Sequence, residues 1–254
     1  MLRALTHKVS SRISECELTF VERTPIDYQL ATCQHDEYES LLTRIGVSVT
    51  SLFENDDYPD ACFVEDTAIV VDELAVICSM GVFSRRGETP LIARELSNYR
   101  DLTHISLPAT IEGGDVLRVG RQILAGQSKR TNIDGIRALK RIFEPIGYQV
   151  SPVTTKGGLH LKSGCTAIDD ETLFVNPESI DIDCLKGFKL LRTPREEPAS
   201  ANVLRVGETV CLQSTFPRAI DLIGRVVKRV ETIDMSELRK AEAGLTCSSI
   251  IFET

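Results

Sequence analysis

Hydrophobic and polar residues follow a pattern that repeats along the chain. Residues 67–78 form two runs rich in β-branched residues, separated by Asp72 and Glu73. Such a pair of runs is typical of two antiparallel strands joined by a tight turn. Similar pairs recur further along the chain, at residues 115–125, 165–175 and 202–212. The pattern therefore predicts four β-hairpins.

Each predicted hairpin is followed by a segment with helical spacing and then by a short apolar run. The clearest helix is residues 131–146, because Ile136, Leu139 and Phe143 fall on one helical face. The other expected helices are residues 90–99, about 179–186 and 217–230. The short third strands are expected at residues 103–107, 148–153, 188–192 and 230–233.

A fifth unit is divided between the two ends of the chain. Residues 28–45 predict a helix and residues 47–53 a strand, without a hairpin before them. Residues 246–252 supply the missing hairpin if they pair with residues 2–8. Five such units predict a closed α/β ring of small mixed sheets without an open edge. An ordinary α/β sandwich with accidental regularity is the alternative.

Composition limits the class of protein. The chain has 254 residues and 42% hydrophobic content, and no linker divides it, so we expect one domain spanning residues 1–254. With 29 basic and 37 acidic residues, the net charge of −8 argues against nucleic-acid or anionic-membrane binding. No long apolar run or signal-peptide core is present, so we expect a soluble cytoplasmic protein, either a monomer or a homodimer.

The eight cysteines do not form a metal-binding or disulfide pattern. They are scattered at positions 16, 33, 62, 78, 165, 184, 211 and 247 without a Cys-x-x-Cys pair, and the chain has only four histidines. Neither a zinc ligand set nor a disulfide framework follows from this spacing. We expect most of these thiols to pack as small apolar groups.

In a ring of repeated units, the residues at the open end of each hairpin converge on the central axis. From the first hairpin to the fifth, these residues are Asp60, Glu65 and Asp66, then Glu112, His160, Asn202 and Cys247. We therefore expect a thiol, an imidazole and several carboxylates to share one central pocket.

A thiol beside an imidazole is a nucleophile with a proton-transfer partner. Cys247 and His160 fit these roles, and Glu112 is placed to orient the imidazole. The alternatives are a packed core thiol, a half-buried strand histidine and a surface turn made by Gly113 and Gly114.

The charged residues around this group indicate the substrate. Glu65 and Asp66 would repel an anion but would bind a planar cation such as guanidinium. Arg85 and Arg130 lie on loops that follow the first two hairpins, where they bind the α-carboxylate of an amino acid or are solvated surface residues. A guanidinium-bearing amino acid is therefore the expected ligand.

Six motifs and their order resemble the dimethylargininases (dimethylarginine dimethylaminohydrolases). The motifs are Phe-Val-Glu-Asp at 63–66, Ser-Arg-Arg-Gly-Glu at 84–88, Glu-Gly-Gly-Asp at 112–115, Ser-Lys-Arg-Thr-Asn at 128–132, Leu-His-Leu-Lys-Ser-Gly at 159–164 and the late Cys247. The resemblance extends from about residue 18 to residue 252. It implies the five-bladed α/β propeller of the guanidino-group-modifying superfamily.

The resemblance also implies roles for individual residues. Cys247 would be the nucleophile, His160 the general acid and base, and Glu112 its carboxylate partner. The residues implied for substrate binding are Asp66 for the guanidinium, Asp60 and Glu65 for the polar wall, Arg85 and Arg130 for the carboxylate, Leu18 on a lid loop, and Leu245 beside the nucleophile. No metal or organic cofactor is expected, and Asn202 has no assigned role.

The implied reaction converts dimethylated or monomethylated arginine to citrulline and an amine through a covalent Cys-thiouronium intermediate. Arginine deiminases and amidinotransferases of the same superfamily resemble this plan but carry His-x-Asp, whereas this chain has His160-Leu161-Lys162. The missing carboxylate suits a guanidinium whose hydrogens are partly replaced by methyl groups. A deiminase or amidinotransferase-like enzyme is one alternative, and a non-catalytic guanidino-compound binding protein is another.

Overall fold

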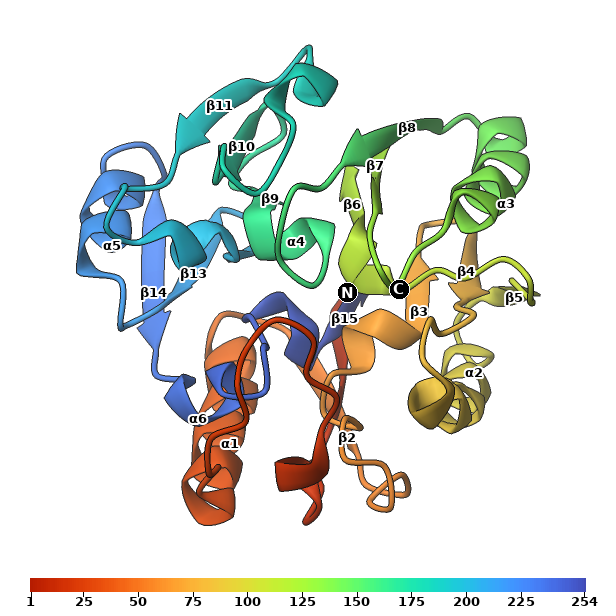
Figure 1. Ribbon diagram of the computed structural model, residues 1–254, viewed down its shortest axis with the longest axis horizontal. Helices are drawn as coiled ribbons and strands as arrows, with labels where there is room; N and C mark the ends of the chain where they lie inside the picture. The colour runs from red at the N-terminus through yellow and green to blue at the C-terminus, as the bar shows by residue number, and fades with distance from the viewer.

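The computed structural model describes residues 1–254 and contains five sheets of three strands each, arranged around a common centre (Figure 1). In each sheet, an antiparallel hairpin is extended by a third strand that runs parallel to the central strand. The structure is a five-bladed α/β propeller. The predicted ring is therefore confirmed, and the α/β sandwich alternative is wrong.

The strands occupy equivalent places in the five blades. The inner strands are β3 (Ala68–Val70), β6 (Val116–Val119), β9 (Cys165–Ala167), β12 (Leu204–Val206) and β15 (Ile250–Glu253). The central strands are β4 (Leu74–Ile77), β7 (Gln122–Gln127), β10 (Thr172–Val175), β13 (Thr209–Gln213) and β1 (Leu2–His7). The outer strands are β5 (Asp101–His104), β8 (Gln149–Thr154), β11 (Lys189–Arg192), β14 (Arg229–Ile233) and β2 (Ser48–Leu52).

The fifth blade joins the two ends of the chain. Strand β1 pairs antiparallel with β15, from Leu2 opposite Glu253 to Leu5 opposite Ile250, and pairs parallel with β2. Both termini consequently lie near the centre of the ring (Figure 1). The predicted pairing of the chain ends is confirmed, and it supplies the blade that lies between the first and fourth blades.

In four of the five blades, a helix lies between the central and outer strands along the chain: α1 (Tyr28–Arg44), α2 (Thr89–Leu96), α3 (Ile133–Phe143) and α5 (Pro217–Gly224). Two short helices complete the set: α4 (Leu161–Gly164) lies near the centre, and α6 (Ser236–Arg239) packs against α1 (Figure 1). The helix expected at residues 179–186 is wrong, because that segment forms only the 3₁₀ turn Ile182–Leu185. Its β-branched and aspartate residues are weak helix formers, and only Leu185 of the turn is buried. No helix in the structure is long and apolar enough to cross a bilayer.

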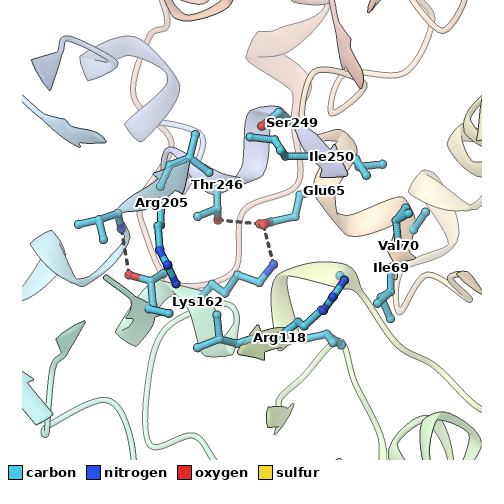
Figure 2. A pocket seen from close by; sticks show the side chains of 18 of the residues that line it. Glu65, Ile69, Val70, Arg118, Lys162, Arg205, Thr246, Ser249 and Ile250 are labelled. Carbon is cyan, nitrogen blue, oxygen red and sulfur yellow. Dashed lines mark hydrogen bonds and ion pairs between the residues drawn. The ribbon is translucent and has the colours of Figure 1, made fainter. Parts of the chain in front are cut away.

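Apolar residues pack between neighbouring blades rather than in one central core. Between the first and second blades, Ile69, Ile123 and Leu139 belong to a cluster of 17 buried residues. Phe143 in this cluster packs edge-on against Tyr148, with ring centroids 5.7 Å apart. The inner strands instead surround a central channel of about 440 Å³ (Figure 2). The blade interfaces therefore hold the ring together and leave its axis open.

Replacing Phe143 tests whether the interfaces between blades stabilise the ring. Phe143 is fully buried, so Phe143→Ala should lower the free energy of unfolding by about 3–5 kcal/mol through lost burial and an unfilled cavity. Phe53 is 70% exposed, and Phe53→Ala should change it by less than about 0.5 kcal/mol. Urea unfolding followed by far-ultraviolet circular dichroism measures both values. Equal stabilities of the two variants would contradict this account of the core.

Candidate active site

A small closed cavity lies where the open ends of the hairpins meet. Six residues of the predicted site line it: Asp60, Asp66, Arg85, Arg130, His160 and Cys247. Its free space is about 10 Å³, which is enough for one water molecule at most. The ring thus brings together residues that are far apart in the sequence, and it leaves them little contact with solvent.

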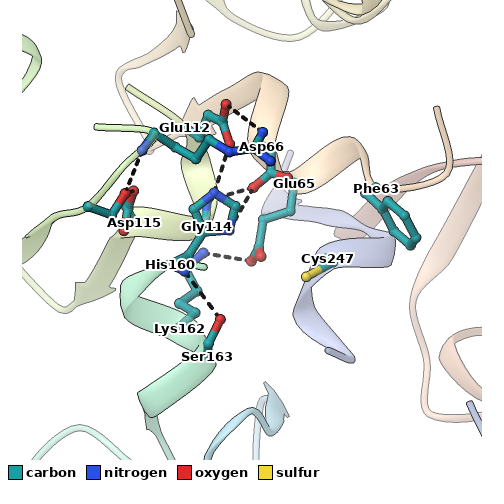
Figure 3. Close-up of polar contacts among 12 residues, drawn as sticks. Phe63, Glu65, Asp66, Glu112, Gly114, Asp115, His160, Lys162, Ser163 and Cys247 are labelled. Carbon is teal, nitrogen blue, oxygen red and sulfur yellow. Dashed lines mark hydrogen bonds and ion pairs between the residues drawn. The ribbon is translucent and has the colours of Figure 1, made fainter. Parts of the chain in front are cut away.

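His160 and Glu112 form a buried pair at one side of the cavity. His160 caps the start of helix α4, and its Nε2 lies 2.7 Å from Oε2 of Glu112, which is fully buried (Figure 3). The other Glu112 oxygen accepts a hydrogen bond from the backbone N of Gly81 at 2.9 Å. A Cβ on Gly114 would lie 2.6 Å from Nδ1 of His160, so only glycine fits beside the ring. The Gly113-Gly114 segment is therefore a buried support for the imidazole and not a surface turn.

The surrounding carboxylates keep His160 protonated. Burial alone would lower the pKa of His160, but Asp66, Asp115 and Glu112 raise it to about 9. In the same way, burial would raise the pKa of Glu112 and of Asp66, but the neighbouring imidazolium holds both below their ordinary values. At neutral pH the site therefore contains an imidazolium between two carboxylates.

Cys247 lies on the 3₁₀ helix Thr246–Ser248 and is partly exposed to the cavity. Its sulfur points toward the side of the cavity that holds His160 and Asp66 (Figure 3). The Sγ atom accepts a hydrogen bond from the backbone N of Gly244 at 3.4 Å. Burial first, and then the charges of Glu65 and Asp66, raise the pKa of Cys247 well above its ordinary value. The unliganded site therefore holds a neutral thiol, which a cationic ligand would help to ionise.

Arg85 is buried and nearly saturated with acceptors. Its Nη1 donates to Oδ2 of Asp66 at 2.6 Å, and its Nε and Nη2 donate to the two oxygens of Glu88 at 3.0 and 2.8 Å. Its Nη2 also donates to the carbonyl of Phe63 at 3.0 Å. Arg85 therefore mainly holds Asp66 in place, and it has little capacity left for a ligand. Glu88 belongs to the 84–88 motif, but the sequence alone did not indicate that its carboxylate binds Arg85.

Arg130 differs from Arg85 because one of its nitrogens has no hydrogen-bond partner. Its Nη1 is buried without an acceptor and lies 3.6 Å from Oε1 of Glu112, while its Nη2 donates to Oγ1 of Thr19 at 3.2 Å. A buried guanidinium N–H without an acceptor is unfavourable unless a ligand supplies one. Arg130 is therefore the cation of the cavity that is available to an anionic group.

The segment of residues 17–21, here called the lid segment, is fastened across the cavity and includes Leu18. The backbone N of Glu17 donates to Oδ2 of Asp60 at 3.1 Å. The carboxylate of Glu242 accepts from the backbone N atoms of Thr19, Phe20 and Val21 at 2.7, 2.6 and 3.0 Å. Glu242 was missed by the sequence analysis, and its backbone φ of 60° makes it the only non-glycine residue in the left-handed region.

Four residues of the predicted site do not line the cavity: Glu112, which binds His160 from behind, Leu18, which packs against a core cluster, Glu65 and Leu245. Glu65 faces the central channel, and its two oxygens accept from Nζ of Lys162 at 2.6 Å and from Oγ1 of Thr246 at 2.7 Å. Leu245 is fully buried in a core cluster. Consecutive residues around the centre, such as Glu65 and Asp66, point to opposite sides of the same wall, and the motif alone did not reveal this.

Two groups of side chains contain possible metal ligands, but their carboxylate oxygens already bind protein donors. Asp66, Glu112 and His160 place three possible ligand atoms within 4.8 Å of one another. Both oxygens of each of these two carboxylates accept hydrogen bonds from protein donors. In the second group, Asp36 and Glu39 bind the ammonium of Lys8 at 2.8 Å each. The carboxylate oxygens of the first group are therefore occupied by protein donors and are not free to coordinate a metal ion.

Comparisons with known proteins identify relatives over most of the chain. The arginine deiminase family model matches residues 32–227. The N(G),N(G)-dimethylarginine dimethylaminohydrolase of Pseudomonas aeruginosa is 34% identical over 228 residues, which cover 89% of this chain and 90% of that protein. The protein of the same description from Streptomyces coelicolor is 33% identical over 249 residues, covering 98% of this chain and 96% of that protein.

The structural comparison agrees with the sequence comparison. A solved structure of the Pseudomonas aeruginosa enzyme, a cysteine-to-serine variant complexed with citrulline, superposes with a TM-score of 0.92. The two chains are 30% identical in this superposition, which covers 98% of each. The fold, the order of the motifs and the near-complete coverage agree. This chain therefore belongs to the dimethylarginine dimethylaminohydrolase family, a branch of the wider arginine deiminase family and a family of hydrolases.

Proposed function

We propose that the protein hydrolyses Nω,Nω-dimethyl-L-arginine and Nω-monomethyl-L-arginine to L-citrulline and dimethylamine or methylamine. One observation carries the proposal: Cys247, the His160–Glu112 pair, Asp66 and the unpartnered N–H of Arg130 meet in one closed cavity. A thiol, a proton donor, a site for a cation and a site for an anion are what a methylated arginine requires. The citrulline complex of the Pseudomonas aeruginosa relative supports the product.

The charges of the cavity favour one orientation of the substrate. The carboxylate of Asp66 would bind the guanidinium, beside Cys247 and His160. The unpartnered Nη1 of Arg130 would bind the α-carboxylate at the other end of the substrate. Arg85 would contribute mainly by fixing Asp66, to which it donates at 2.6 Å.

The first half of the reaction forms a covalent adduct. The guanidinium charge lowers the pKa of Cys247, whose proton passes to solvent, and the thiolate attacks the guanidinium carbon. The new S–C bond is followed by cleavage of the C–N bond to the methylated nitrogen. His160, protonated in the resting site, donates its proton to the departing amine. An S-alkylthiouronium remains on Cys247.

The second half of the reaction releases the product with water. Neutral His160 takes a proton from a water molecule, whose oxygen then bonds to the thiouronium carbon. The C–S bond then breaks, the proton of the new hydroxyl group passes to the Cys247 sulfur, and citrulline leaves with the thiol restored. No oxidant, reductant or second substrate is needed, because water supplies the oxygen and His160 carries the proton in both halves.

The position of Lys162 favours methylated arginine over arginine. In this chain Lys162 stands where related enzymes carry a second carboxylate, and its Nζ is bound to Glu65 on the channel side. Asp66 is then the main acceptor for the guanidinium, so a nitrogen that carries methyl groups leaves no second buried carboxylate unsatisfied. An arginine deiminase or amidinotransferase-like activity is the alternative, and it predicts that arginine is the better substrate.

We also propose that this activity is located in the cytoplasm. All eight cysteines are free thiols, as is typical of proteins in a reducing compartment. Three of them are not buried away from solvent: Cys33 is exposed, and Cys184 and Cys247 are partly exposed. An oxidising compartment would expose these thiols to uncontrolled oxidation.

A citrulline-release assay tests the proposed function directly. Dimethylarginine and monomethylarginine should yield citrulline at least about tenfold faster than arginine, expressed as kcat/KM. Cys247→Ser should lower kcat by at least about a thousandfold, because a hydroxyl is a far weaker nucleophile. The exposed Cys33→Ser serves as the matched control and should retain activity. Faster turnover of arginine would move the assignment to a deiminase, and silence with all three substrates would indicate a binding protein.

Glu112→Gln tests the role of the buried pair through the pH profile. Because the pKa of His160 is raised to about 9, the wild-type rate should fall as pH rises through that value and the imidazolium is lost. The same proton stabilises the fold fully below about pH 6.5, and this contribution also disappears as pH rises through about 9. Removing the Glu112 charge should move the alkaline limb of kcat to lower pH by about one unit. An unmoved limb would contradict the assignment of His160 as the acid.

Glu242→Ala tests whether the lid segment must be fastened. Loss of three hydrogen bonds to the carboxylate should raise KM about tenfold and speed hydrogen–deuterium exchange of residues 19–21. Glu22 is exposed in the same region and makes no hydrogen bond through its side chain, so Glu22→Ala is the matched control. Unchanged exchange in Glu242→Ala would show that other contacts hold the lid.

A further inference from the structure

The side chain of Asn202, which has no role in the proposed reaction, is bound through all of its polar groups. Asn202 lies two residues before β12 and is 7% exposed. Its Oδ1 accepts from the backbone N of Thr246 at 3.1 Å, and its Nδ2 donates to Oγ1 of Thr246 and to the carbonyl of Lys162, each at 3.0 Å. Asn202 therefore connects the residue before Cys247 to helix α4, which follows His160.

These contacts belong to a ring of hydrogen bonds that connects four residues, here called the floor circuit: Asn202, Thr246, Glu65 and Lys162. The hydroxyl of Thr246 donates to Oε2 of Glu65 at 2.7 Å, and Nζ of Lys162 donates to Oε1 at 2.6 Å (Figure 2). The four residues come from different blades, and three of them line the central channel behind the active site. The circuit thus forms the wall between the channel and the cavity.

Asn202 also contacts the turn that carries the hydrogen-bond donor to the thiol. A Cβ on Gly244 would lie 2.2 Å from Cγ of Asn202, so the amide group packs directly against the Gly244 backbone. The N–H of Gly244 points at Sγ of Cys247, 3.4 Å away. Asn202 therefore touches the chain on both sides of Leu245, at Gly244 and at Thr246, immediately before the nucleophile.

We propose that Asn202 is a positioning residue for the nucleophile, and that it fixes Cys247 relative to His160 by holding Thr246, Gly244 and Lys162 together. The inference rests on the function proposed above, because it assumes that Cys247 attacks the substrate. A nucleophile misplaced by about 1 Å loses about a hundredfold in rate. A purely structural residue would instead lower stability without altering the properties of the thiol.

Four variants separate these roles. Asn202→Ala removes all three hydrogen bonds, whereas Asn202→Asp keeps the shape and the acceptor but loses the donors and adds a negative charge. Thr246→Val removes the hydroxyl at nearly constant volume, and Thr246→Ser keeps it. Asn176→Ala is the matched control, because Asn176 is 8% exposed, donates to Ser179 at 2.8 Å, accepts from the backbone N of Glu178 at 3.1 Å and does not line the cavity.

Two readouts are needed, kcat with KM on methylated arginine and the pH dependence of Cys247 alkylation by iodoacetamide, followed by peptide mass spectrometry. We expect Asn202→Ala, Asn202→Asp and Thr246→Val to lower kcat about ten- to a hundredfold while KM stays within about threefold. The alkylation profile should shift in each, and toward higher pH in Asn202→Asp because of the added charge. Thr246→Ser and Asn176→Ala should keep wild-type values.

The Asn176→Ala control separates a loss of positioning from a general loss of stability. Equal losses of kcat in Asn202→Ala and Asn176→Ala at matched changes in Tm would overturn the proposal, as would an alkylation profile that does not move. The alkylation profile requires no substrate. A wild-type protein that releases no citrulline, together with a shifted profile in the Asn202 variants, would refute the proposed function and support the positioning of the thiol.

Discussion

A buried charge imbalance at the centre of the ring is the feature on which the site depends. Five buried carboxylates, Asp60, Asp66, Glu88, Glu112 and Asp115, lie at the cavity or beside its residues, and they face three cations, Arg85, Arg130 and His160. Burial raises the pKa of Asp60, and it raises the pKa of Glu88 to about 7 even though Arg85 lies beside that carboxylate. Negative charge is therefore in excess, and a buried excess charge is unfavourable without a partner. The methylated arginine of the proposed function carries one net positive charge, so it would relieve this imbalance and favour ionisation of the thiol.

The fold supplies this arrangement by joining the chain ends. Cys247 lies three residues before β15, and the pairing of β1 with β15 places this segment in the ring. The same pairing completes the fifth blade. The wall between the two central spaces is one residue thick at several points. Asp66 and Cys247 face the active-site cavity, whereas their neighbours Glu65 and Thr246 face the channel and bind each other. The reactive groups are thus held from behind by a second layer of polar contacts.

The hairpins were predictable because alternating hydrophobic and polar residues, many of them β-branched, indicate strands locally. The ring was predictable because five similar units follow one another at regular spacing. The meeting of Cys247, His160 and Glu112 was predictable because equivalent positions of repeated units converge. The orientations of individual side chains were not predictable. Arg85 and Arg130 look alike in sequence, but Arg85 donates to Glu88, Asp66 and Phe63, whereas Nη1 of Arg130 has no hydrogen-bond acceptor. The helix expected at residues 179–186 was wrong. The apolar residues of this segment have helical spacing, but its β-branched and aspartate residues are weak helix formers and favour a turn. Glu242 gave no local signal, because its importance arises from residues more than 220 positions away.

Glu242 holds the lid segment while its own backbone adopts an unusual conformation. A non-glycine residue in the left-handed region is strained by about 1–2 kcal/mol. Three hydrogen bonds from the lid backbone to its carboxylate offset that strain in the observed conformation. A cavity with space for about one water molecule is too small for an amino acid, so the proposed function requires the lid segment to open. Such an opening would break the three bonds but would let Glu242 relax, so its net cost would be smaller than the three bonds alone would indicate.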